Sequence, residues 1–136
     1  SWEPTSRTDL EKAFQNEFGF RPGTYVTDLK SRTVNVGDWW GHWMTFTYSS
    51  NIFQRVVSSG FKPVTEENLS EHLGPHWKQS IDNPSPNAPK WWKTPKNLTG
   101  VVFFQENSRK DFPASYAFIW ADATNGRIYL ESCAWQ

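Results

Sequence analysis

The sequence predicts an α+β fold: a mainly antiparallel sheet of about five strands with two to three short helices on one face. Two observations support it. Apolar residues recur at helical spacing near 10–18 and 52–57, whereas alternating or short apolar runs at 39–48 and 101–134 are typical of strands. The expected order is helix, strand, strand, helix, helix, loop, strand, strand, strand. With 136 residues, the chain has the length of one domain, 1–136.

The first helix is expected to start at Thr8, which has the spacing of a capping box with Glu11, and to stop at Gly19. The polar segment 25–36 predicts an edge strand. A turn at 37–38 then leads into a strand over 39–48. By composition, the even-numbered residues of that strand form its core side, and the odd-numbered ones form the other side.

Two more helices have clear boundaries. Ser49 and its neighbours offer N-caps for a helix that carries an apolar stripe over 52–57, and Gly60 predicts a left-handed C-cap. Thr65 is the expected cap of a helix over 66–73, which Gly74 must end together with the proline that follows it.

Residues 75–99 predict a long Pro-rich loop that also bears Trp77, Trp91 and Trp92. Disordered segments are poor in aromatic residues, so we expect these indoles to hold the loop on the body of the protein. Strands are predicted at 101–105, 116–121 and 127–134, with a tight turn at 125–126.

The central strands are apolar on both sides, and the helices are expected to cover one face. The second face must then be covered by the Trp-bearing loop, a second copy of the chain or a ligand. Function is therefore expected on that second face.

Composition excludes several classes of function. The 14 basic and 14 acidic residues cancel, which disfavours nucleic-acid partners. No apolar run has the length of a membrane span. The sequence also lacks phosphate-binding or cofactor motifs, and His72 and His76 are separated by a helix break, so neither a metal nor a cofactor is expected. Cys133 is the only cysteine and is expected to be buried and inert. We expect the protein to be soluble. We expect its first residues to be those of a trimmed chain or of an exported product without its signal.

The density of tryptophan is the main functional signal, with nine in the chain and two adjacent pairs. Successive side chains of an extended segment point in opposite directions, so one indole of each pair is expected at the surface. We predict a non-catalytic binding or interaction domain whose ligand-binding anchors are Trp39, Trp43, Trp91 and Trp92. Its partner is a protein, a peptide, a glycan or a second copy of the chain. A competing interpretation is that both pairs only clamp the long loop.

An enzyme is the alternative, although the lack of a recognised catalytic motif disfavours it. Asp38 and His42 could form a general-base pair in a small hydrolase, with Asp122 as a further acid. This requires His42 to line a solvent-open cavity with a second titratable group in reach. Otherwise, Asp38 and Asp122 are turn residues and His42 is a hydrogen-bonded core residue.

Overall fold

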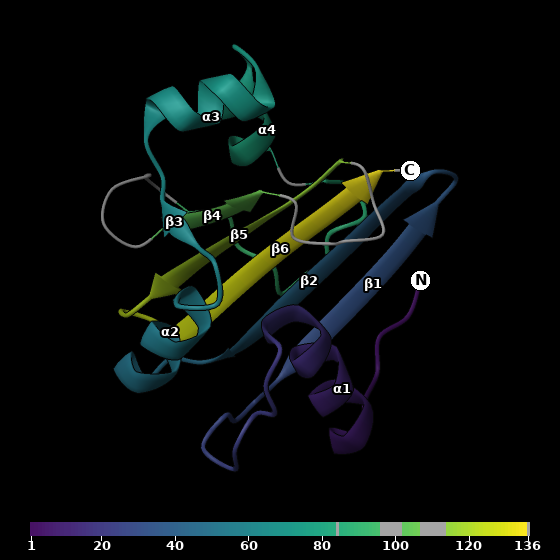
Figure 1. Ribbon diagram of the computed structural model, residues 1–136. Helices are drawn as coiled ribbons and strands as arrows, with labels where there is room; N and C mark the ends of the chain where they lie inside the picture. Colours follow the sequence, from purple (N-terminus) through teal and green to yellow (C-terminus); the bar gives the residue numbers. More distant parts are fainter. Residues whose placement is uncertain (84, 96–101, 107–113, 136) are drawn as a thin grey trace.

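The computed structural model describes residues 1–83, 85–95, 102–106 and 114–135 (Figure 1). In chain order the elements are α1 (Arg7–Phe18), β1 (Lys30–Val36), β2 (Trp39–Thr47), α2 (Ser50–Val57), β3 (Lys62–Pro63), α3 (Glu66–Leu73), α4 (Trp77–Asp82), β4 (Val102–Glu106), β5 (Ala114–Asp122) and β6 (Arg127–Trp135).

The strands form one antiparallel sheet in the order β1-β2-β6-β5-β4-β3. The predicted α+β class and the approximate order of elements are confirmed. The additional strand is β3, whose two residues pair with β4 and carry too little periodicity to be recognised in the sequence. The segment β1 lies at one edge of the sheet, as its polarity predicts.

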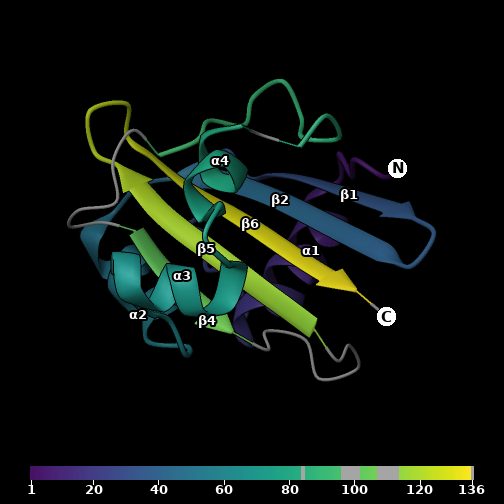
Figure 2. The ribbon, with the colours of Figure 1, turned by 90° about the horizontal axis from the view of Figure 1, so that it is seen from above.

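One face of the sheet, called the first face here, is covered by α1 and α2 (Figures 1 and 2). Phe14 of α1 is fully buried, and its ring contacts those of Phe18 and Phe46 at centroid distances of 4.7 and 5.3 Å. Ile52 and Val56 of α2 complete this core from the side of β5 and β6. This face therefore holds the larger hydrophobic core.

The opposite, second face is covered in part by α3 and α4 (Figure 2), so the prediction that the helices all lie on one face was wrong. Leu69 of α3 is fully buried there against the side chains of Phe118, Trp120 and Tyr129. Helix α4 lies within the segment that the sequence predicted to be loop. Its six residues lack a side-chain cap, so tertiary packing of Trp77 against the sheet defines the helix more than local signals do.

Three helix or strand boundaries differ from the prediction. Helix α1 is capped by Ser6, whose hydroxyl accepts from the backbone N–H of Asp9, so the Thr8 cap was wrong. Helix α2 ends at Ser58 with right-handed geometry, ahead of Gly60. In the segment 25–29, Asp28 has a φ of 50°, which interrupts the extended backbone before β1.

The prediction that only the even side of β2 is core was also wrong. Residues 41–46 are buried on both sides, and Trp43, on the odd side, is fully buried. Within the predicted loop 75–99, residue 84 and residues 96–99 lie outside the described residues. Within the described parts of the chain, no helix has the length and apolarity needed to cross a bilayer.

Candidate functional site

The strand register places aromatic and acidic side chains in rows across the second face. Trp43 of β2 lies opposite Glu131 of β6, which lies opposite Phe118 of β5. In the neighbouring row, Tyr129 of β6 lies opposite Trp120 of β5, and their rings stack at 4.8 Å with an angle of 18°. These rows form the floor of a pocket.

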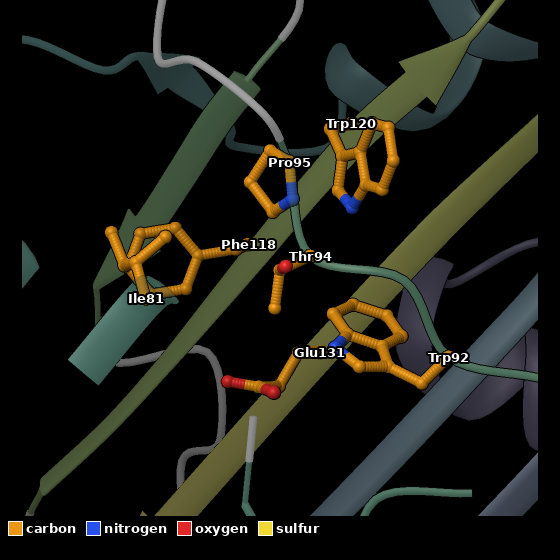
Figure 3. Close-up of a pocket in the computed structure, with 7 residues that line it drawn as sticks. All are labelled: Ile81, Trp92, Thr94, Pro95, Phe118, Trp120 and Glu131. Carbon is orange, nitrogen blue, oxygen red and sulfur yellow. The ribbon is translucent and has the colours of Figure 1, made fainter. Parts of the chain in front are cut away.

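The pocket lies where α4 and the segment 92–95 cross β5 and β6 (Figure 3). The cavity offers about 20 Å³ for the centre of a water molecule, inside a hollow of about 320 Å³ out to its mouth. This is little more than one ordered water needs, so only a group of a few atoms can enter as it stands. Its lining consists of Ile81, Trp92, Thr94, Pro95, Phe118, Trp120 and Glu131.

Two indole N–H groups at the pocket have no hydrogen-bond partner among the described residues. They are the Nε1 groups of Trp92 and Trp120, and both are buried. Figure 3 shows the Trp92 nitrogen on the edge of its ring that faces Glu131, and the Trp120 nitrogen on the edge of its ring that faces the segment at Thr94. A buried donor without an acceptor lowers the stability of the protein by about 1–3 kcal/mol. An acceptor inside the pocket would therefore be stabilising.

Glu131 supplies the acidic group of the pocket. Its Oε2 accepts a hydrogen bond of 2.9 Å from Nε1 of Trp43. Burial raises the pKa of Glu131, and the hydrogen bond from Trp43 lowers it by a smaller amount. Oε1 has no hydrogen bond from the described residues, so this carboxyl retains capacity for a ligand.

Two further titratable side chains, Cys133 and Tyr116, lie beside each other on β6 and β5. Cys133 and Tyr116 hydrogen-bond to each other on the same face, and burial raises the pKa of both the thiol and the phenol. A thiol with a raised pKa is a poor nucleophile. The structure agrees with the expectation that Cys133 is a buried, free thiol.

The four predicted anchors occupy different environments. Trp92 lines the pocket and meets the ring of Tyr129 edge-on at 5.8 Å. Trp43 is fully buried and reaches the pocket only through Glu131. Trp39 is partly exposed and lies across Gly41, where an added Cβ would come within 2.5 Å of its ring. Trp91 is also partly exposed and lies outside the pocket lining.

The alternative site centres on His42, which lies on the first face and is 2 % exposed. Its Nδ1 is 2.5 Å from Oε1 of Glu17 in α1, and its Nε2 is 2.6 Å from Oγ of Ser31 in β1. The carboxylate partner of His42 is therefore Glu17. Figure 1 places α1 directly over this part of the sheet.

The structure does not bring Asp38 or Asp122 to His42. Asp38 is exposed in the turn between β1 and β2. Asp122 accepts hydrogen bonds from the backbone and side chain of Asn125 at 3.1 and 2.7 Å, which is the role of a turn residue. Ala117 is the residue of β5 that lies in the same row as His42. Asp122 is five positions from Ala117 along β5, so its side chain lies on the opposite face of the sheet.

One hydroxyl beside His42 is unsatisfied. Ser132 lies directly opposite His42 in the register, is fully buried, and its Oγ has no partner among the described residues. Ser132 is not part of the lining of the pocket on the second face, in contrast with the indoles of Trp92 and Trp120.

Sequence reasoning missed Trp120, Glu17 and Ser31 as site residues. Strand alternation contained part of the missing signal, because Trp120 and Glu131 have the parity that faces the Trp-bearing loop. The Glu17 contact joins residues 25 positions apart, and no local pattern encodes it.

The described residues contain no group of three or more histidine, cysteine or acidic side chains that could hold a metal ion. Comparisons of the chain with protein-family models, with curated proteins and with solved structures found no match.

Proposed function

We propose that the protein is a non-catalytic binding module that recognises its ligand on the second face of the sheet. The observation that carries this proposal is the pair of unpartnered indole N–H groups, on Trp92 and Trp120, at the same pocket as the Glu131 carboxyl. Retaining unsatisfied buried donors lowers stability, and a ligand with matching acceptors would recover that free energy on binding.

A line of ring contacts extends this site along the second face toward Trp135, near the end of β6. Phe118 contacts Tyr116 at 5.2 Å, and Tyr116 contacts Trp135 at 5.6 Å. Trp135 is 39 % exposed. A peptide, protein segment or glycan could therefore place one group in the pocket and lay the rest on this aromatic track, since aromatic rings offer large contact area at low entropic cost.

The test is a binding screen with a peptide library and a glycan library, read by tryptophan fluorescence. Trp92→Phe and Trp120→Phe remove one N–H each while keeping a ring, and Trp2→Phe is the matched control because Trp2 is 51 % exposed and distant from the pocket lining. Loss of binding in the two pocket variants alone supports the proposal. Binding that survives both substitutions, or no binding by either library, contradicts it.

A second copy of the chain is one of the partners that this face could bind. Val36 and Trp135 are exposed, and Trp39 lies between them in the register. Light scattering on the wild type and on Trp135→Asp decides this: a dimer that becomes a monomer identifies the partner as a second copy.

A hydrolase is the second candidate, because Ser31, His42 and Glu17 have the order of a nucleophile, a base and an orienting acid. Against it, Ser31 is only 3 % exposed, so a substrate would have to displace α1 to reach it. A fluorophosphonate probe should label the wild type and not Ser31→Ala if this candidate is correct. Absence of labelling on the native wild type leaves the cluster with a structural role.

A further inference from the structure

Building on the proposed binding function, we infer that the pocket binds an amide group: the carbonyl oxygen faces the indole N–H groups of Trp92 and Trp120, and the amide N–H faces Glu131. The inference concerns the chemical group that enters the pocket.

The donors and acceptors of the pocket are complementary to a group that carries both functions. Trp92 and Trp120 each present an N–H and can only donate. Glu131 presents a carboxyl whose Oε1 has no hydrogen bond from the described residues, while Oε2 is held by Trp43. An amide places its acceptor and its donor on adjacent atoms, so one planar group can address both sides of the pocket (Figure 3).

Charged groups, whether anionic or cationic, do not match the lining of the pocket. The lining of the pocket contains no basic side chain and one acidic one, so a carboxylate or phosphate would meet Glu131 without a compensating cation. An ammonium group would suit Glu131 but has only donors, and it would leave both indole donors without an acceptor. A neutral group remains.

Size and apolar lining limit the ligand further. The enclosed part of the pocket has room for little more than one water, so it excludes a whole sugar ring, and only a small planar group that reaches in from the wider mouth fits. Ile81, Pro95 and Phe118 form apolar walls suited to the methyl or methylene carbon next to an amide. Acetamido groups of amino sugars and the side chains of glutamine or asparagine share this chemistry.

The test is a titration of the ¹⁵N-labelled protein with acetamide, read on the indole N–H signals. The signals of Trp92 and Trp120 should move saturably, because both gain an acceptor, while that of Trp2 should stay in place. Three compounds of similar size serve as controls: acetate, N,N-dimethylacetamide, which lacks the donor, and 2-propanol. Glu131→Gln should weaken acetamide binding about tenfold, the effect of one lost hydrogen bond.

Two matched pairs identify the source of the amide. Diacetylchitobiose against cellobiose tests the acetamido sugar, and the peptide Gly-Gln-Gly against Gly-Glu-Gly tests the side-chain amide. Stronger binding of the amide member of either pair supports the inference and names the source. Weak binding of both members of both pairs restricts the site to small free amides, provided that acetamide itself binds.

The inference is overturned if acetamide leaves the Trp92 and Trp120 signals in place, or if dimethylacetamide or 2-propanol binds equally well. Its failure is distinguishable from failure of the binding function. A library ligand that moves these two signals when acetamide does not leaves the binding function standing, whereas both fail if no ligand moves them.

Discussion

The two faces of the sheet handle buried polar groups in opposite ways. On the first face, both ring nitrogens of His42 have partners within the protein, Ser31 and Glu17, while the buried hydroxyl of Ser132 has no partner among the described residues. On the second face, two indole donors at one pocket lack acceptors among the described residues. The first face therefore uses its polar groups for stability, and the second retains hydrogen-bonding capacity that a ligand can use.

Removing the centre of the first core should have the largest effect on stability. Phe14→Ala deletes a fully buried ring that contacts Phe18, Phe20 and Phe46, and it should lower the free energy of unfolding by about 3–5 kcal/mol. Urea denaturation measures this change. Tyr25→Ala, at a residue that is 59 % exposed, is the control and should change stability by about 0.5 kcal/mol or less.

The next largest effect should come from the polar cluster on the same face. His42→Ala removes the imidazole that pairs with the Glu17 carboxyl, whose side chain is 5 % exposed, at a cost of about 3 kcal/mol. Adding Glu17→Gln should recover part of that loss, because the two residues form one network. Ligand binding on the second face should persist in both variants. Unchanged stability together with lost binding or hydrolysis would place function at His42.

The acidity of Glu131 gives a smaller and pH-dependent effect. Its pKa is raised in the folded protein above the ordinary 4.5, so folding favours the protonated form. The associated stability is fully present below the unfolded-state pKa and is lost as the pH rises through the folded-state pKa. Glu131→Gln should therefore flatten the pH dependence of unfolding above about pH 4.5. If instead the wild type gained stability relative to Glu131→Gln as the pH rose above about 4.5, the fold would favour the ionised form of Glu131.

The smallest effect on stability is expected at the pocket itself. Trp120→Phe removes a donor that has no partner, so it should change the free energy of unfolding by about 1 kcal/mol or less. Trp43→Phe is the matched control on the same face, because it removes a donor that is bonded to Glu131, and it should cost about 1–3 kcal/mol more. Equal costs for the two substitutions would show that the Trp120 indole has a partner in solution.

Local patterns in the sequence predicted most of the fold. The α+β class, the turn before Trp39 and the helix that Thr65 caps all depend on residues within a few positions of each other. Helix α4 and the caps at Ser6 and Ser58 were missed, because short helices and helix ends are decided by tertiary packing and by competing polar neighbours.

The candidate site was predicted less completely than the fold. The sequence indicated the second face and the residue Trp92, since a Trp-bearing loop had to pack somewhere. It could not show that Trp120 and Glu131 face that loop while Trp39 and Trp91 lie outside the pocket lining. Those facts depend on how far-separated segments cross the sheet, and the same limit concealed the partnership of Glu17 with His42.

The most direct test of the central claim is a crystal structure of the protein soaked in acetamide. The account predicts an amide in the pocket with its oxygen within about 3.2 Å of Nε1 of Trp92 and Trp120, and its nitrogen at a similar distance from the Glu131 carboxyl. Those contacts would establish the second face as a binding site. A pocket that holds only water at saturating acetamide, or that is closed by the protein's own side chains, would contradict the account.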